Sequence, residues 1–143
     1  MISFRVPGIP QPQGSHKAFV NRKTGRAIIT QDNTRLRSWR SEVAWCAAQA
    51  AGATTAMLGP VRVYLVFWLP RPKAHYKANG SLKSDAPRYC PKRPDVDKLC
   101  RAVLDALTES GIVRDDGQVA DLRAIKMYAD HAPETVVEVD DIK

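Results

Sequence analysis

The sequence has no run of apolar residues that approaches the roughly 18 needed to cross a bilayer. Its N-terminal segment also lacks the apolar core of a signal peptide. Cysteines are few: Cys46, Cys90 and Cys100 are odd in number, and their spacing matches no zinc motif. These absences argue against a membrane protein and against a disulfide-stapled secreted scaffold. We therefore expect a reduced, intracellular protein that forms a single domain over residues 1–143.

Acidic residues are scarce in the first part of the chain. Residues 1–94 contain sixteen Lys and Arg against three Asp and Glu, a balance of +13. Residues 95–143 contain six against twelve, a balance of −6, so that the whole chain carries +7. A basic part joined to an acidic part in one domain favours a polyanion held by the first and a metal ion held by the second. The alternative is a basic, solvated surface that binds nothing in particular.

Local patterns predict most of the secondary structure. The expected strands are, in chain order, 2–6, the two arms of a hairpin that turns at Thr24–Gly25, 61–69, 119–128 and 135–139. The expected helices are one over 32–51, capped by Asp32 or Asn33, and one that starts near Pro94 and ends at Gly111. Residues 119–128 also fit a helix. We favour a strand because the segment follows an Asp-Asp-Gly turn and ends at a second hairpin loop.

Residues 70–94 form a long segment without periodicity. It contains five prolines, and seven Lys and Arg against one acidic residue. A loop of this length in a compact domain is usually functional or disordered. We expect a mobile, basic arm that becomes ordered on a phosphate backbone. The cations expected to meet phosphates lie in the hairpin, in this arm and at the start of the second helix: Lys17, Arg22, Lys23, Arg26, Lys73, Lys77, Lys92, Arg93 and Lys98.

Carboxylates gather around the second predicted helix. Asp95 and Asp97 open it, and Asp115 and Asp116 follow its end. Each pair has a structural explanation, because Asp caps helix N-termini and an Asp-Gly pair forms turns. Asp95 and Asp97 cannot both be the N-cap, however, and gathered carboxylates repel one another unless a cation compensates them. Oxygen ligands suit Mg²⁺ or Mn²⁺, so the cluster predicts a divalent metal site.

The same helix has two contrasting sides. Its apolar side comprises Leu99, Ala102, Val103, Ala106 and Leu107. Its opposite side comprises Asp97, Arg101, Asp105 and Thr108. We therefore expect the apolar side of this helix to pack in the core and the opposite side to expose carboxylates with a guanidinium among them.

The stretch PDVDKLCRAVLDALTESGIVRDDGQV resembles the RusA-type Holliday junction resolvases. Their hallmark is an Asp-x-Asp that opens a helix, a basic residue four positions later and a following Asp-Asp. The similarity runs from Asp95 to Lys126 and extends more weakly over most of the chain. It implies an α+β fold, one small domain with a mixed β-sheet packed against two main helices. It also implies a homodimer in a bacterial or phage-infected cytoplasm that binds four-way DNA junctions and cuts them in recombination and repair, with Mg²⁺ or Mn²⁺.

The resemblance further implies roles for individual residues. Asp95, Asp97 and Asp116 match the family's metal-binding and catalytic carboxylates. The family's helix lysine falls at Arg101, which keeps the charge and can clamp phosphate but cannot transfer a proton. Lys126 is the lysine left for a catalytic role, and it or Arg101 would neutralise charge on the scissile phosphate. Two alternatives stay open: a catalytically inactive protein that binds branched DNA on the same scaffold, and a basic scaffold or assembly protein.

Overall fold

A computed structural model describes residues 1–14, 17–20, 23–30 and 34–143, with the backbone alone described at 17–20 and 27–30. The expected strands and helices form within two residues of their predicted bounds, as β1 (Ile2–Pro7), β2 (Lys17–Val20), β3 (Ala27–Thr30), α1 (Thr34–Ala51), β4 (Val61–Leu69), α2 (Val96–Ser110), β5 (Val119–Tyr128) and β6 (Glu134–Asp141). Two short 3₁₀ helices, η1 (Lys73–His75) and η2 (Asp116–Gln118), were not predicted. The expected caps of α1, Asp32 and Asn33, lie outside the described residues.

Four strands form a mixed sheet in the order β1-β6-β4-β5. Strand β6 is antiparallel to both of its neighbours, whereas β4 and β5 run parallel. A parallel pair needs a long crossover, and the chain between β4 and β5 contains α2. The prediction that the last two strands, β5 and β6, pair as a hairpin is wrong, because β4 lies between them in the sheet. Strand β4 is the most apolar strand, and burial of its alternate side chains favours a central position.

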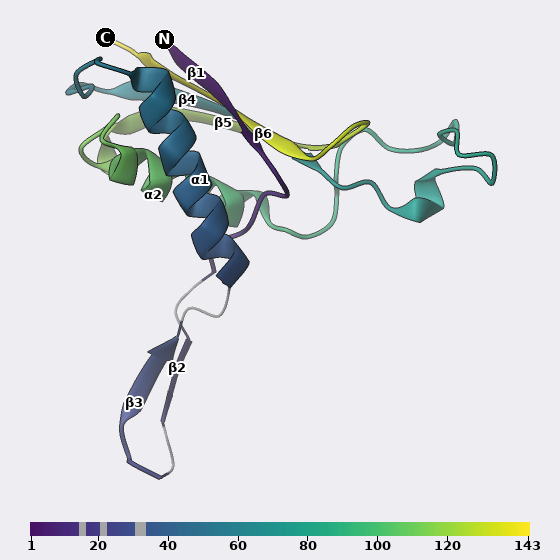
Figure 1. Cartoon of the computed structure of the whole chain (residues 1–143), viewed down its shortest axis with the longest axis horizontal. Helices are drawn as coiled ribbons and strands as arrows, with labels where there is room; N and C mark the ends of the chain where they lie inside the picture. Colours follow the sequence, from purple (N-terminus) through teal and green to yellow (C-terminus); the bar gives the residue numbers. More distant parts are fainter. Residues whose placement is uncertain (15–16, 21–22, 31–33) are drawn as a thin grey trace.

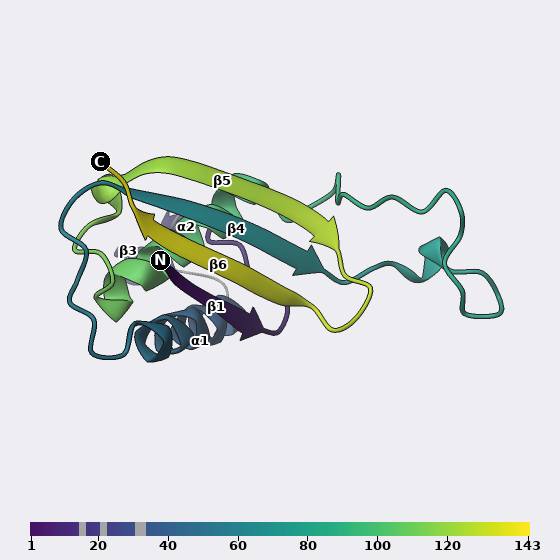
Figure 2. The same ribbon diagram turned by 90° about the horizontal axis from the view of Figure 1, so that it is seen from above.

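Both long helices cover the same face of the sheet (Figures 1 and 2). Alternate residues of β4 and β6 point into the core between sheet and helices. The predicted apolar side of α2 is confirmed, because all five of its residues are buried. Full burial of a leucine such as Leu99 or Leu107 contributes about 1.5–3 kcal/mol. The two helices also meet through an ion pair between Arg40 and Glu109. The expected α+β fold with two main helices is therefore confirmed.

The basic arm, residues 70–94, extends from the end of β4 away from the body (Figure 1). Its root is held by Arg71, whose side chain is only 4% exposed. The Arg71 guanidinium donates to the carbonyl of Pro87 at 2.7 Å and lies over the ring of Tyr128. Backbone hydrogen bonds join the returning limb to β5, from Cys90 N to Lys126 O and from Tyr128 N to Arg88 O. The arm therefore has a folded root, and its mobility stays a prediction.

The β2–β3 hairpin projects from the body on a different side from the arm (Figure 1). Its register pairs Lys17 with Thr30 and Val20 with Ala27, which confirms the predicted hairpin. Within the described ranges, no helix has the length and apolarity that a bilayer crossing requires.

Candidate active site

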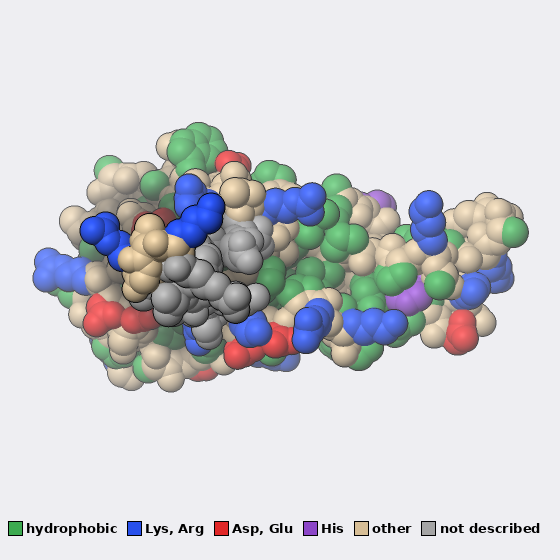
Figure 3. All heavy atoms as spheres, turned by 90° about the horizontal axis from the view of Figure 1, so that it is seen from below, with side chains coloured by type: hydrophobic (Ala, Val, Ile, Leu, Met, Phe, Trp, Pro, Cys, Tyr) green, Lys and Arg blue, Asp and Glu red, His purple; other side chains and the backbone are tan. Residues whose placement is uncertain are grey.

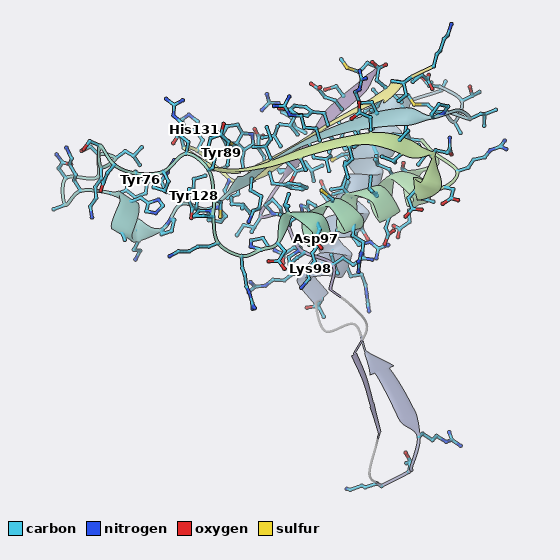
Figure 4. The ribbon with its side chains drawn as sticks, turned by 180° about the vertical axis from the view of Figure 1, so that it is seen from behind. Tyr76, Tyr89, Asp97, Lys98, Tyr128 and His131 are labelled. Atoms are coloured by element: carbon cyan, nitrogen blue, oxygen red, sulfur yellow. The ribbon has the colours of Figure 1, made fainter. Side chains whose placement is uncertain are left out.

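Asp95 occupies the N-cap position of α2, but its side chain makes no capping hydrogen bond to the described residues. The carboxylate instead lies 3.5 Å from the ammonium of Lys98. Asp97 is exposed in the first turn, where the helix dipole favours negative charge. Figure 4 shows Asp97 and Lys98 at the start of α2, at the end of that helix nearest the arm and the hairpin. Capping therefore explains neither carboxylate fully.

Asp97, Arg101 and Asp116 line one open pocket of about 450 Å³ between α2 and β5. The rest of its lining is apolar: Val96, Cys100, Leu104, Leu122 and Ala124. Among the described residues, Arg101 has no ion-pair partner, so its guanidinium is available to an anion. The pocket thus combines two carboxylates and one cation on a mostly apolar floor.

Asp115 and Asp116 have different roles: Asp115 caps a short helix, and Asp116 lines the pocket. The Asp115 carboxylate accepts a hydrogen bond from Gly117 N at 3.2 Å and forms a capping box with Gln118 at the start of η2. Gln118 also donates to the carbonyls of Met57 and Gly59, at 2.8 and 2.9 Å, and so fixes this loop to the chain ahead of β4. Asp115 is therefore held in place, and Asp116 is left to face the pocket.

The carboxylates near Asp116 help to raise its pKa. Its pKa is raised, first by a hydrogen bond with Asp115, then by partial burial and by the negative charges of Asp115 and Asp105. The pKa of Asp115 is lowered, chiefly by the hydrogen bond from Gly117 N. The negative charges of Asp115 and Asp105 thus contribute to the raised pKa of Asp116, and a bound cation would offset that contribution.

Gln13 holds the helix that carries the site, a contact that the sequence analysis did not predict. This residue lies in the Pro- and Gly-rich loop after β1, is only 8% exposed and donates to the Asp105 carboxylate at 2.5 Å. Its backbone N donates to the carbonyl of Lys98 at 3.0 Å. The loop therefore ties the first strand to the first turns of α2. No spacing rule connects a glutamine in one loop with a helix more than eighty residues later.

Lys126 does not contact the carboxylates in the described structure. Its ammonium donates to the carbonyls of Lys92 at 2.6 Å and Pro94 at 2.7 Å. These carbonyls belong to the segment that leads directly into Asp95. The observed position makes Lys126 a residue that holds the start of the site, and its expected catalytic role stays a prediction.

The three carboxylates expected to bind metal, Asp95, Asp97 and Asp116, do not all line the same pocket. Asp97 and Asp116 share the pocket, while Asp95 is not among its lining residues. In the part of the chain that the structure describes, no group of three or more His, Cys, Asp or Glu side chains is arranged to hold a metal ion. Mg²⁺ commonly takes one or two protein carboxylates and completes its shell with water and substrate phosphate. The oxygen donors of Asp97 and Asp116 fit that chemistry.

Most of the cations expected to bind phosphates lie on the two projections, whereas Lys98 lies in the first turn of α2 beside Asp95. Lys23 and Arg26 are exposed at the turn of the hairpin, whereas the side chain of Lys17 and the whole of Arg22 lie outside the described residues. On the arm the exposed candidates are Lys73, Lys77, Lys92 and Arg93, and Lys83 and Arg88, which were not proposed individually, are exposed as well. Figure 3 shows Lys and Arg side chains spread along the arm and around the hairpin. Basic groups therefore lie on either side of the carboxylate end of α2.

Comparison with known proteins identifies the family. Residues 7–140 match the family described as Endodeoxyribonuclease RusA, so the chain belongs to this family of Holliday junction resolvase nucleases. The chain is also 30% identical over 133 residues to the "Uncharacterized protein YqaN" of Bacillus subtilis (strain 168), a match that covers 90% of this chain and 89% of that protein. The expected resemblance is therefore confirmed over nearly the whole chain, and branched DNA is the ligand that the family binds.

Proposed function

We propose that this protein is a Mg²⁺-dependent endonuclease that cuts four-way DNA junctions by paired phosphodiester hydrolysis in recombination and repair. Mn²⁺ is the alternative ion. The observation that carries the proposal is the pocket in which Asp97, Arg101 and Asp116 meet, at the end of α2 nearest the basic arm and hairpin. Membership of the RusA family supports branched DNA as the substrate.

Asp97 and Asp116 would hold the metal ion, with Asp95 beside them at the N-cap of α2. When bound, the ion would activate a water molecule and neutralise charge that develops on the phosphate during hydrolysis. The raised pKa of Asp116 comes first from a hydrogen bond with Asp115, but the negative charges of Asp115 and Asp105 contribute as well, and an ion held here would compensate them.

Arg101 would hold the scissile phosphate. It lies one helical turn after Asp97 and lines the same pocket, and a guanidinium can engage two phosphate oxygens at once. Arginine stays protonated through the reaction, so Arg101 would stabilise charge and transfer no proton. Lys126 would act through the backbone, by holding the segment from Lys92 to Pro94 that positions Asp95.

The arm and the hairpin would bind the DNA backbone. Their exposed cations suit phosphate contacts, which supply most of the affinity of sequence-independent binding. A homodimer with two-fold symmetry would present two sites to a two-fold symmetric junction and would allow paired nicks.

The test is cleavage of a synthetic four-way junction with Mg²⁺ by Asp97→Asn, a change that removes charge and keeps shape. We expect loss of cleavage by at least about 1,000-fold, with binding to the junction unchanged or stronger. The matched control is Asp141→Asn, which removes an exposed carboxylate at the end of β6 and should leave cleavage unchanged. Full cleavage by Asp97→Asn would contradict the proposal.

One observation favours a second candidate, a catalytically inactive protein that binds branched DNA. Arg101 stands where the family carries a lysine. This alternative predicts salt-dependent junction binding by the unaltered chain and no nicking with Mg²⁺ or Mn²⁺ at any pH. The same assay therefore separates the two candidates.

A further inference from the structure

The pocket between α2 and β5 has more apolar lining than a metal site needs. Five apolar residues, which we call the apolar floor, complete its lining: Val96, Cys100, Leu104, Leu122 and Ala124. The first three follow one another at intervals of four residues along α2, so they form a row about 12 Å long beside Asp97 and Arg101. A metal ion and one phosphate would engage the carboxylates and the guanidinium. The apolar floor therefore faces another part of the substrate.

Strand β5 forms the other wall of this pocket. Leu122 and Ala124 lie on the helix side of the sheet, in register with buried residues of β4. The next β5 residue on that side is Lys126, whose ammonium already donates to two backbone carbonyls. Among the described residues that line the pocket, the polar side chains are therefore the two carboxylates and the guanidinium assigned above.

The apolar floor has a fixed base and an accessible rim. Cys100 belongs to the core cluster, and Leu104 and Ala124 pack against it. Val96 and Leu122, by contrast, are 39% and 43% exposed. Single exposed apolar side chains are common on protein surfaces, but these two share a pocket with the candidate catalytic groups. They are therefore accessible to an apolar part of whatever the pocket binds.

We propose that the apolar floor holds the deoxyribose next to the scissile phosphate and thereby selects DNA over RNA at the cut. The inference rests on the proposed function, in which Arg101 holds that phosphate. Each phosphate is joined covalently to two sugars, so a strand bound at Arg101 brings a sugar to the apolar floor. The bases are a poorer match, because their edges are polar and they are paired and stacked within the arms of the junction.

The two sugars differ at the 2′ carbon. Deoxyribose carries only hydrogens there, whereas ribose carries a hydroxyl that is both a donor and an acceptor. Against the apolar floor this hydroxyl would lose its water and gain no hydrogen-bond partner, which is unfavourable for a buried polar group. Leu122 and Val96, at the accessible rim, are the side chains that would exclude it.

The first test varies the sugar alone. The cut site is mapped on an all-DNA four-way junction, and a single ribonucleotide is then placed on either side of the scissile phosphate. We expect a ribonucleotide in at least one of these positions to slow single-turnover cleavage with Mg²⁺ by about 10- to 100-fold, the discrimination that an apolar pocket achieves against an added hydroxyl. A 2′-fluoro nucleotide, which has the pucker of ribose without the hydroxyl, should be cut nearly as fast as the deoxynucleotide.

The second test varies the apolar floor. Leu122→Asn supplies an amide that can bond to the 2′ hydroxyl, and it should reduce the ratio of DNA to ribonucleotide cleavage rates by at least about 5-fold. Val96→Thr, which keeps the shape and adds a hydroxyl, is the second variant. The matched control is Leu58→Asn, at a leucine that is 66% exposed outside the pocket, and it should leave the ratio unchanged. A general loss of activity lowers both rates and does not move the ratio.

A binding experiment separates this inference from the nuclease proposal. All-DNA and ribonucleotide junctions compete for the unaltered chain with Ca²⁺, which also takes oxygen ligands. If no junction is cut with Mg²⁺ or Mn²⁺, the nuclease proposal fails, and the competition decides the inference: weaker binding of the ribonucleotide junction, relieved by Leu122→Asn, supports it, and equal binding overturns it. If junctions are cut, equal rates for DNA and ribonucleotide junctions, or a ratio that neither folded variant changes, would overturn it.

Discussion

The ammonium of Lys126 lies 2.7 Å from the carbonyl oxygen of Pro94, the residue immediately before Asp95. A second hydrogen bond, of 2.6 Å, joins the same ammonium to the carbonyl of Lys92. Strand β5 and the end of the arm are thereby fixed to each other just ahead of the first carboxylate of the site. The position of Asp95 therefore depends on a residue thirty-one places later in the chain.

Lys126→Met removes both hydrogen bonds and leaves two carbonyls without this donor. We expect the free energy of unfolding to fall by about 1.5–3 kcal/mol, the usual value for hydrogen bonds to a charged group. Single-turnover cleavage should slow by about 10- to 100-fold through displacement of the carboxylates. Urea denaturation and junction cleavage measure the two effects, with the exposed Lys143→Met as control. If Lys126 positions and does not react, the pH dependence of the remaining rate stays that of the unaltered chain.

Arg101 can be tested by two substitutions with different charge. Arg101→Lys keeps the positive charge and should retain cleavage within about 10-fold, because the pocket still presents a cation to the phosphate. Arg101→Met should lower the single-turnover rate by about 100- to 1,000-fold, as expected for loss of one group that stabilises the transition state. The exposed Arg114→Met serves as control. Equal rates for Arg101→Met and the control would exclude Arg101 from the reaction.

Salt dependence measures how the arm contributes to DNA binding. Lys73→Gln and Lys77→Gln each remove one exposed cation from the arm. Each should weaken junction binding at low salt and reduce the slope of log affinity against log salt by about 0.9 if that residue neutralises one phosphate. Fluorescence anisotropy with a labelled junction gives the slopes. Lys143→Gln, at the opposite end of the body, should leave the slope as it is, and unchanged slopes for both arm variants would contradict a phosphate role.

The root of the arm predicts a loss of stability at high pH. Burial, with a smaller contribution from Cys90, raises the pKa of Tyr128 above the value of a free tyrosine. The folded state therefore favours the neutral phenol. This stabilisation is complete below the unfolded pKa of about 10 and is lost as pH rises through the higher folded pKa.

Tyr128→Phe removes that titration. Between about pH 9 and about pH 11, the free energy of unfolding should therefore fall further for the unaltered chain than for Tyr128→Phe. Denaturation curves across this range measure the difference. Tyr89→Phe changes an exposed tyrosine of the arm, close to β5 in the fold, and should behave like the unaltered chain. If the free energy of unfolding fell equally with pH for all three proteins, the ionisation of Tyr128 would not be coupled to folding.

Short-range patterns in the sequence determined the elements and the chemistry of the site. The apolar side of α2 follows from helical spacing alone, and each of its five predicted residues is buried. Asp97, Arg101 and Asp116 were identified by residue type and spacing, and they line one pocket. Such features are predictable because residues a few places apart on a helix or strand have a nearly fixed spatial relation.

Only the tertiary structure decided which distant segments meet. It placed β4 between the last two strands, brought Gln13 to Asp105 and engaged Lys126 with the chain before Asp95. It also separated Asp115, which caps η2, from Asp116, which faces the pocket. These relations depend on strand order and on packing between parts far apart in sequence. No local pattern specifies them, because the free energy that selects them comes from burial and hydrogen bonding across the whole fold.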